Sequence, residues 1–206
     1  MDNLQVEHAL DWMAKTNEKI QDNKEYLTTL DQAIGDGDHG INMARGFGEV
    51  MKKLNGEAYQ HAADVMKDAA MTLMSKVGGA AGPLYGTAFL KLSMTFKGTD
   101  VDYATFSKGI EDALNGVKQR GKAEIGEKTL VDVWSAVANA LRENEGFDSE
   151  VILQSAKSGM EGSKDIKATK GRAAYLGDRS IGHLDPGSVS SFYLFESLAE
   201  VINEGA

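Results

Sequence analysis

The sequence predicts a single all-α domain of about eight helices. Apolar residues recur at helical spacing in four well-separated segments: Leu4, Leu10 and Met13; Val65, Met66, Ala69 and Leu73; Val131, Trp134, Val137 and Leu141; and Phe192, Phe195, Leu198 and Val201. No comparable run alternates apolar and polar residues as a half-buried strand would. Because neither a low-complexity linker nor an internal repeat divides the chain, we expect one domain over residues 1–206.

The predicted helices are separated by short joints rich in glycine. These joints contain "KLNGE", "KVGGAAG", "FKGTD", "KQRGKAEIGEKT" and "NEGFD", where we expect glycine to end a helix with a positive φ. Residues that favour the first turn or the cap of a helix predict four starts: Pro83; Thr129 paired with Asp132; Asp148 or Ser149; and Asp185 before Pro186.

The composition narrows the class of protein. The chain has no cysteine, which excludes disulfides and thiolate metal sites and favours a reducing compartment. A net charge of -9 disfavours nucleic acid as a partner, because binding to a phosphate backbone needs a basic surface. The N-terminal stretch is charged throughout, and no later run reaches about 18 apolar residues. We therefore expect a cytoplasmic protein without a membrane partner.

The stretch "DQAIGDGDHG" at residues 31–40 places three carboxylates beside flexible backbone. Asp31 falls in the last turn of a predicted helix, and Asp36 and Asp38 follow its end, so the three can converge on one point. Like charges this close repel unless a cation lies among them, and oxygen ligands alone suit Mg²⁺. A solvated helix end with Asx-turns is the alternative. A calcium loop of the EF-hand type counted from Asp36 fails, because Phe47 occupies the position that requires glutamate.

Two further segments are suited to phosphate. "GGAAGPLYGT" at residues 78–87 precedes an apolar helical run, and a helix N-terminus presents free backbone N–H groups to an anion. It lacks the lysine of a P-loop, and close helix packing is the alternative reading. "KGRAAYLGDRSIGHLDPGS" at residues 170–188 carries Arg172 and Arg179, which could hold phosphate oxygens or form ordinary surface ion pairs.

Four ordered motifs resemble the nucleotide-binding L subunit of dihydroxyacetone kinase over nearly the whole chain. They are "LDQAIGDGDHGINM", "GGAAGPLYGT", "GEKTLVDVW" and "KGRAAYLGDRSIGHLDPGS". The resemblance implies one domain over residues 1–206, folded as an all-helical barrel of eight antiparallel helices, which binds ADP or ATP with two Mg²⁺ ions at one end. Relatives often carry serine where this chain has Ala81, so only a backbone contact is expected there.

The resemblance also implies the site residues. The metal ligands would be Asp31, Asp36 and Asp38. Nucleotide contacts would come from glycine-rich and helix-start positions in the four motifs: His39, Gly40, Asn42, Gly79, Ala80, Ala81, Gly121, Thr129, Leu130, Arg172, Asp185, Pro186 and Gly187. Arg179 is a weaker candidate. No general base or nucleophile is assigned to this chain, and His39 and His183 are expected to orient or cap.

The implied activity is a phosphotransferase reaction of glycerol metabolism shared among subunits. Bound ADP would be phosphorylated by a phosphohistidine protein of the phosphotransferase system, the M-type donor subunit. The phosphoryl group would then pass to dihydroxyacetone on a separate K subunit, so we expect a homodimer or a hetero-complex. Three alternatives remain open: ATP as the direct donor, a different small acceptor, and a non-catalytic nucleotide-binding regulator that partners a transcription factor.

Overall fold

The computed structural model describes residues 1–205 and is all-helical over that range. It contains nine α-helices and one 3₁₀-helix. In chain order they are α1 (Val6–Asp22), α2 (Lys24–Ile34), α3 (His39–Asn55), α4 (Ala62–Lys76), α5 (Ala81–Phe96), α6 (Tyr103–Gly121), α7 (Leu130–Glu143), α8 (Ser149–Gly162), η1 (Arg172–Ser180) and α9 (Pro186–Glu204). Within the described residues the only β-type pairing is an isolated bridge between Asn3 and Asp102, so the predicted all-α class is confirmed.

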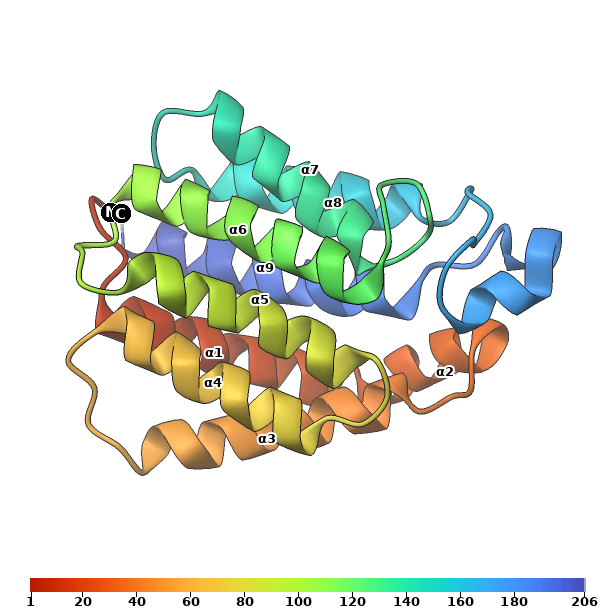
Figure 1. Ribbon diagram of the computed structural model, residues 1–206, viewed down its shortest axis with the longest axis horizontal. Helices are drawn as coiled ribbons and strands as arrows, with labels where there is room; N and C mark the ends of the chain where they lie inside the picture. Colours follow the sequence, from red (N-terminus) through yellow and green to blue (C-terminus); the bar gives the residue numbers. More distant parts are fainter. Residues whose placement is uncertain (206) are drawn as a thin grey trace.

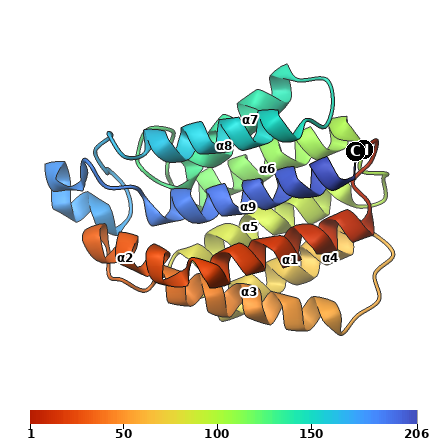
Figure 2. The same cartoon turned by 180° about the vertical axis from the view of Figure 1, so that it is seen from behind.

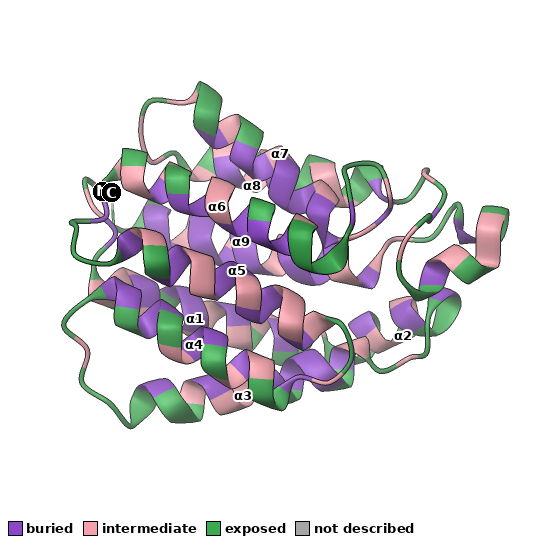
Figure 3. Cartoon of the chain, viewed as in Figure 1, coloured by how far each residue is buried: buried purple, intermediate pink, exposed green. Residues whose placement is uncertain are grey.

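Eight of the helices pack around a common core. Each contacts the next in the order α1, α3, α4, α5, α6, α7, α8 and α9, and α9 returns to α1 (Figure 1 and Figure 2). Trp12 of α1 reaches the interior and makes edge-to-face contacts with Phe89 of α5 and Phe106 of α6, at centroid distances of 6.1 and 6.4 Å. Its indole N–H donates to the backbone carbonyl of Leu194 at 2.8 Å. Buried residues lie on the faces that the helices turn toward one another (Figure 3).

The helix α2 and the 3₁₀-helix η1 lie together at one end of the molecule, away from both chain termini (Figure 1). The extra α-helix arises because Asn23 interrupts the first helical pattern and separates α1 from α2. Residues 170–188 were predicted only as a polar segment, yet Ala173 from this segment packs with Ala168 and with Ile34 of α2 in a small apolar cluster. This second cluster positions η1 beside α2.

Helix starts follow the prediction more closely than helix ends. Thr129 and Asp132 form a capping box at α7, Asp148 caps α8, and Asp185 accepts from the backbone N–H of Ser188 at 2.6 Å in α9. Glycine does not end every helix with a positive φ.

Three helix ends differ from the glycine prediction. The cap that follows α7 is Asn144 with a φ of -103°, and Gly146 is not among the glycines with a positive φ. Gly56 after α3 has a φ of -90°. Helix α6 ends at Gly121, and the left-handed residue is the following cap, Lys122, with a φ of 50°. No helix among residues 1–205 is long and apolar enough to cross a membrane.

Candidate nucleotide and metal site

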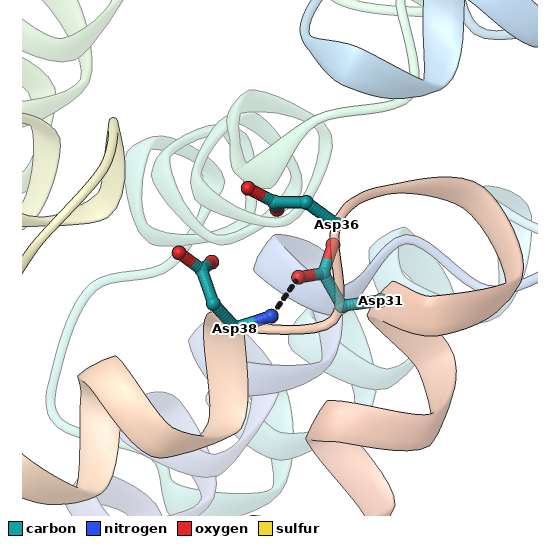
Figure 4. Close-up of side chains that lie close together, drawn as sticks. All are labelled: Asp31, Asp36 and Asp38. Atoms are coloured by element: carbon teal, nitrogen blue, oxygen red, sulfur yellow. Dashed lines mark hydrogen bonds between the residues drawn. The ribbon is translucent and has the colours of Figure 1, made fainter.

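Three aspartates converge at the end where α2 and α3 meet. Asp31 lies in the last turn of α2, while Asp36 and Asp38 lie in the loop before α3. One carboxylate oxygen from each lies within 4.8 Å of the others (Figure 4). The sequence spacing predicted this convergence, because all three residues belong to one helix end and the loop that follows it.

The loop between α2 and α3 is held by Asp31. One of its carboxylate oxygens accepts the backbone N–H groups of Asp38 at 2.8 Å and His39 at 3.0 Å (Figure 4 shows the first). Gly35 is necessary here, because a Cβ at this position would lie 2.0 Å from the other carboxylate oxygen of Asp31. Gly37 has a φ of +76°, a conformation that favours glycine. Asp31 is buried, whereas Asp36 and Asp38 are exposed.

A polar cleft of about 310 Å³ opens beside the three carboxylates. Five chain segments line it, and twelve of the predicted site residues are among them: Asp31, Asp36, Asp38, His39, Asn42, Gly79, Ala80, Ala81, Thr129, Arg172, Asp185 and Pro186. The lining also includes Gly78, Lys128, Lys170 and Gly171, which were not singled out from the sequence. The tertiary structure therefore brings together motifs that are more than a hundred residues apart.

The start of α5 forms one wall of this cleft. Gly79 has a φ of +66°, and the cap residue Ala80 offers no side-chain acceptor to the first N–H groups of the helix. The positive end of the α5 dipole thus lies beside the same cleft as the negative charges of Asp36 and Asp38. A ligand that carries both anionic oxygens and cations would satisfy both walls.

A second, more apolar cleft of about 450 Å³ adjoins the first. It shares Ala80, Thr129, Lys170 and Gly171 with the polar cleft. The predicted residues Gly121 and Leu130 line it, together with apolar side chains of α5 to α7: Pro83, Leu84, Val117, Ala123 and Val131. The two clefts together offer a polar region and an apolar region to one elongated ligand.

Two predicted residues line neither cleft. A Cβ at Gly40 would lie 2.1 Å from the backbone oxygen of Lys24 and 2.5 Å from the hydroxyl of Thr28, so this glycine permits close packing of α3 on α2. Gly187 lies in the first turn of α9, where its carbonyl accepts from Ser190 at 3.2 Å. Both glycines thus lie next to residues of the cleft without lining it themselves.

The structure distinguishes the two arginines of residues 170–188. Arg172 lines the polar cleft and forms an ion pair with Asp36, while Arg179 lines neither cleft. The exposed His183 also lies outside both linings.

Lys128 is the buried residue of the polar cleft's lining that the sequence reasoning missed. It is buried, with a left-handed φ of 63°. Its ammonium group donates to three backbone carbonyls that follow α8, those of Ser163, Lys164 (3.3 Å) and Ile166 (3.2 Å). Burial lowers the pKa of Lys128, and nearby carboxylates such as Asp185 act in the opposite direction. The only signal was a lysine directly before the predicted cap Thr129.

Two titratable groups beside the carboxylates have shifted pKa values. Burial lowers the pKa of His39 to about 4, although the charge of Asp31 acts against this, so the imidazole is neutral at neutral pH. Burial raises the pKa of Asp185 to about 7, and the N–H of Ser188 partly offsets that rise.

Comparison with known proteins places this geometry in context. The family model described as DAK2 domain matches residues 33–200. The chain is 50% identical over 192 residues to "PEP-dependent dihydroxyacetone kinase 1, ADP-binding subunit DhaL" of Listeria innocua, covering 93% of this chain and 94% of the relative. It is 49% identical over 199 residues to "PTS-dependent dihydroxyacetone kinase, ADP-binding subunit DhaL" of Lactococcus lactis, covering 97% and 99%. The Escherichia coli "PEP-dependent dihydroxyacetone kinase, ADP-binding subunit DhaL" is 39% identical over 202 residues, covering 95% and 96%.

Solved structures share the fold. The native dihydroxyacetone kinase of C. freundii matches with a TM-score of 0.75 at 20% identity, over 93% of this chain and 34% of that one. The same kinase in complex with AMP-PNP and Mg²⁺ matches with a TM-score of 0.70 at 21% identity, over 96% and 33%. This chain thus spans about a third of each solved chain.

Proposed function

The chain belongs to the DAK2 domain family, and from this premise we propose that it is the ADP-binding subunit of a PEP-dependent dihydroxyacetone kinase. The observation that carries the proposal is the pairing of three convergent carboxylates with the N-terminus of α5 across one cleft. The names of the three relatives, each aligned over nearly its full length, supply the reaction.

Asp31, Asp36 and Asp38 would hold Mg²⁺. Their convergence supports this, because hard oxygen donors in a cluster suit a hard divalent cation. We propose two ions, since a nucleoside diphosphate and two exposed carboxylates would otherwise place several negative charges together. Bound Mg²⁺ would supply charge neutralisation of the phosphates, and the buried Asp31 would keep the loop in its binding shape through its two N–H bonds.

The nucleotide would lie across both clefts. The apolar cleft, with Leu130 and Gly121, suits an adenine ring, and the backbone of residues 78–81 at the start of α5 suits phosphate oxygens. Arg172 reaches the same cleft with a cationic group that can bind phosphate by paired hydrogen bonds. The acidic chain would accept a polyphosphate because cations and helix N–H groups neutralise it.

The chain would take part in transfer by positioning rather than by covalent chemistry. Phosphoryl transfer depends mainly on alignment and charge stabilisation, and bound ADP would supply the group that accepts and then donates the phosphoryl. His39 is neutral and hydrogen-bonded to Ser190, which supports an orienting role. The K subunit would bring dihydroxyacetone, and an M-type phosphohistidine protein would bring the phosphoryl group. The words "PEP-dependent" and "PTS-dependent" in the names of two relatives support a donor of this kind.

The test measures the product in three mixtures. With Mg-ATP alone, this chain should form no dihydroxyacetone phosphate in an assay coupled to glycerol-3-phosphate dehydrogenase. Adding a K subunit should start turnover, and adding the phosphohistidine donor should make the reaction catalytic in ADP. Product formation by the chain alone would contradict the subunit role. Turnover that needs stoichiometric ATP despite the donor would identify an ATP-dependent kinase, and nucleotide binding without any turnover would identify a regulator.

A further inference from the structure

A line of hydrogen bonds runs from the core to His39 and links four helices. Trp134 of α7 donates its indole N–H to Ser191 of α9 at 3.2 Å. The Ser191 hydroxyl lies 2.8 Å from the hydroxyl of Tyr85 on α5, which lies 2.7 Å from that of Ser190. Ser190 in turn lies 2.9 Å from Nε2 of His39, the first residue of α3. The described structure thus connects a buried tryptophan to the wall of the polar cleft.

The tryptophan sets the direction of this line. An indole N–H can only donate, so Ser191 accepts at that end and its own hydrogen is free for another acceptor. Tyr85 is the neighbour of Ser191 on the other side. Ser191 therefore donates to Tyr85, and the single phenolic hydrogen of Tyr85 must go elsewhere. Burial raises the pKa of Tyr85, which keeps that hydrogen in place at neutral pH.

Distances determine the remaining two steps. The hydroxyl of Tyr85 can donate to Ser190 at 2.7 Å or to the carbonyl of Gly187 at 3.4 Å, and the shorter bond is the stronger. Ser190 can donate to His39 Nε2 at 2.9 Å or to Gly187 at 3.2 Å. Hydrogen bonds that point the same way along a chain polarise one another, which further favours donation to His39.

The other ring nitrogen of His39 faces the cleft. Nδ1 has no hydrogen-bond partner among the described residues. It is also not buried, because the one buried side-chain nitrogen or oxygen without a partner in that range is Ser135 Oγ. Nδ1 is therefore in contact with the open space of the cleft that His39 lines.

We propose that Trp134, Ser191, Tyr85 and Ser190 form a directional relay that holds His39 as the Nδ1–H tautomer. The four are positioning residues: they aim an N–H donor into the cleft, where a ligand oxygen can accept it. That the ligand oxygen belongs to a phosphate rests on the proposed function, whereas the tautomer does not.

The tautomer is read directly from the imidazole nitrogen shifts of ¹⁵N-histidine-labelled protein without nucleotide, at pH 7.5 with EDTA. We expect a protonated Nδ1 and an unprotonated Nε2 for His39, assigned by comparison with a His39→Gln protein. A protonated Nε2, or an imidazolium with both nitrogens protonated, would overturn the proposal. Because no nucleotide is present, this result stands whether or not the protein binds ADP.

Variants of the relay give a second readout. Tyr85→Phe removes the hydroxyl that orients Ser190, and we expect the His39 shifts to move to the average of both tautomers and the affinity for Mg-ADP to fall about three- to tenfold. Tyr103→Phe is the matched control, because its hydroxyl donates to the carbonyl of Leu141 far from the cleft, and it should leave the shifts unchanged. Unchanged His39 shifts in Tyr85→Phe would contradict the relay.

A serine pair covers the case in which Tyr85→Phe does not fold. Ser190→Ala removes the direct partner of His39 and should also produce mixed tautomers. Its control is Ser197→Ala, a buried serine of the same helix whose hydroxyl donates to the backbone oxygen of Tyr193. Equal His39 shifts in the two serine variants would overturn the proposal. Normal shifts with no ADP binding by the parent protein would instead count against the proposed function.

Discussion

A guanidinium nitrogen of Arg172 lies 2.8 Å from a carboxylate oxygen of Asp36, joining η1 to the loop before α3. The side chains are 67% and 34% exposed, and an ion pair of this kind contributes only about 0–1 kcal/mol to stability. Breaking this ion pair therefore costs little stability. We expect a cation on the carboxylates to release Arg172, which could then bind a phosphate beside it.

Replacing Arg172 by glutamine is expected to weaken Mg-ADP binding about 10- to 100-fold, because a charge-assisted hydrogen bond is worth about 1.5–3 kcal/mol. The free energy of unfolding without ligand should change by less than about 0.5 kcal/mol. Calorimetric titration measures the first quantity and urea denaturation the second. Arg179→Gln is the matched control, since Arg179 lines neither cleft. An equal loss of affinity in both variants would refute the specific role of Arg172.

Mg-ADP is expected to raise the melting temperature. A ligand a thousandfold above its Kd stabilises the folded state by about 4 kcal/mol, which for a chain of this size corresponds to roughly 8–16 °C. ADP with EDTA should give little shift. Asp36→Ala should lose most of the shift yet melt normally without ligand, because Asp36 is exposed. The exposed Asp11 of α1 provides the control Asp11→Asn, which should behave like the parent; a full shift in Asp36→Ala would exclude Asp36 as a metal ligand.

Lys128 is expected to matter for folding as well as for the cleft. Lys128→Met leaves three carbonyl groups at the end of α8 without their donor, and we expect a loss of about 2–4 kcal/mol in the free energy of unfolding. Lys122→Met is the matched control, because Lys122 also has a positive φ but is exposed. Urea denaturation of both proteins compares them. Similar losses would mean that replacing a lysine by methionine, rather than the loss of the three hydrogen bonds, accounts for the effect.

The shifted carboxyl of Asp185 predicts a dependence of stability on pH. Its folded-state pKa is about 7, above the unfolded value near 4, so between these the folded state binds more protons and its stability falls as pH rises. Asparagine does not titrate, yet its side-chain oxygen can still accept from Ser188. The free energy of unfolding of the parent minus that of Asp185→Asn should therefore decline from about pH 4 to pH 7 and then level off.

Urea denaturation with EDTA at several pH values measures this difference. Asp148→Asn serves as the matched control, since Asp148 caps α8 from an exposed position. A parallel decline for both substitutions would show that burial of Asp185 is not the cause.

Some of these features follow from the sequence alone because they depend on neighbouring residues. Helical spacing determined the all-α class, and side chains such as Asp185 and Thr129 determined where α9 and α7 begin. The convergence of Asp31, Asp36 and Asp38 was also predictable, since one helix end and one turn produce it. Local hydrogen bonds and local periodicity carry all of this information.

Other features were decided only by the tertiary structure. Periodicity does not reveal that Arg172 rather than Arg179 lines the cleft, because that choice depends on how η1 packs against α2. Nor does it reveal that Lys128 donates to the carbonyl groups that follow α8. It also does not reveal that the hydroxyl of Tyr85 is hydrogen-bonded to α9. Each of these relationships joins segments at least 35 positions apart; the bond of Lys128 to Ser163 spans 35 positions and that of Tyr85 to Ser190 spans 105. Such pairs form only when helices that are distant in the chain pack together, because packing, unlike capping, depends on the shapes and volumes of many side chains at once.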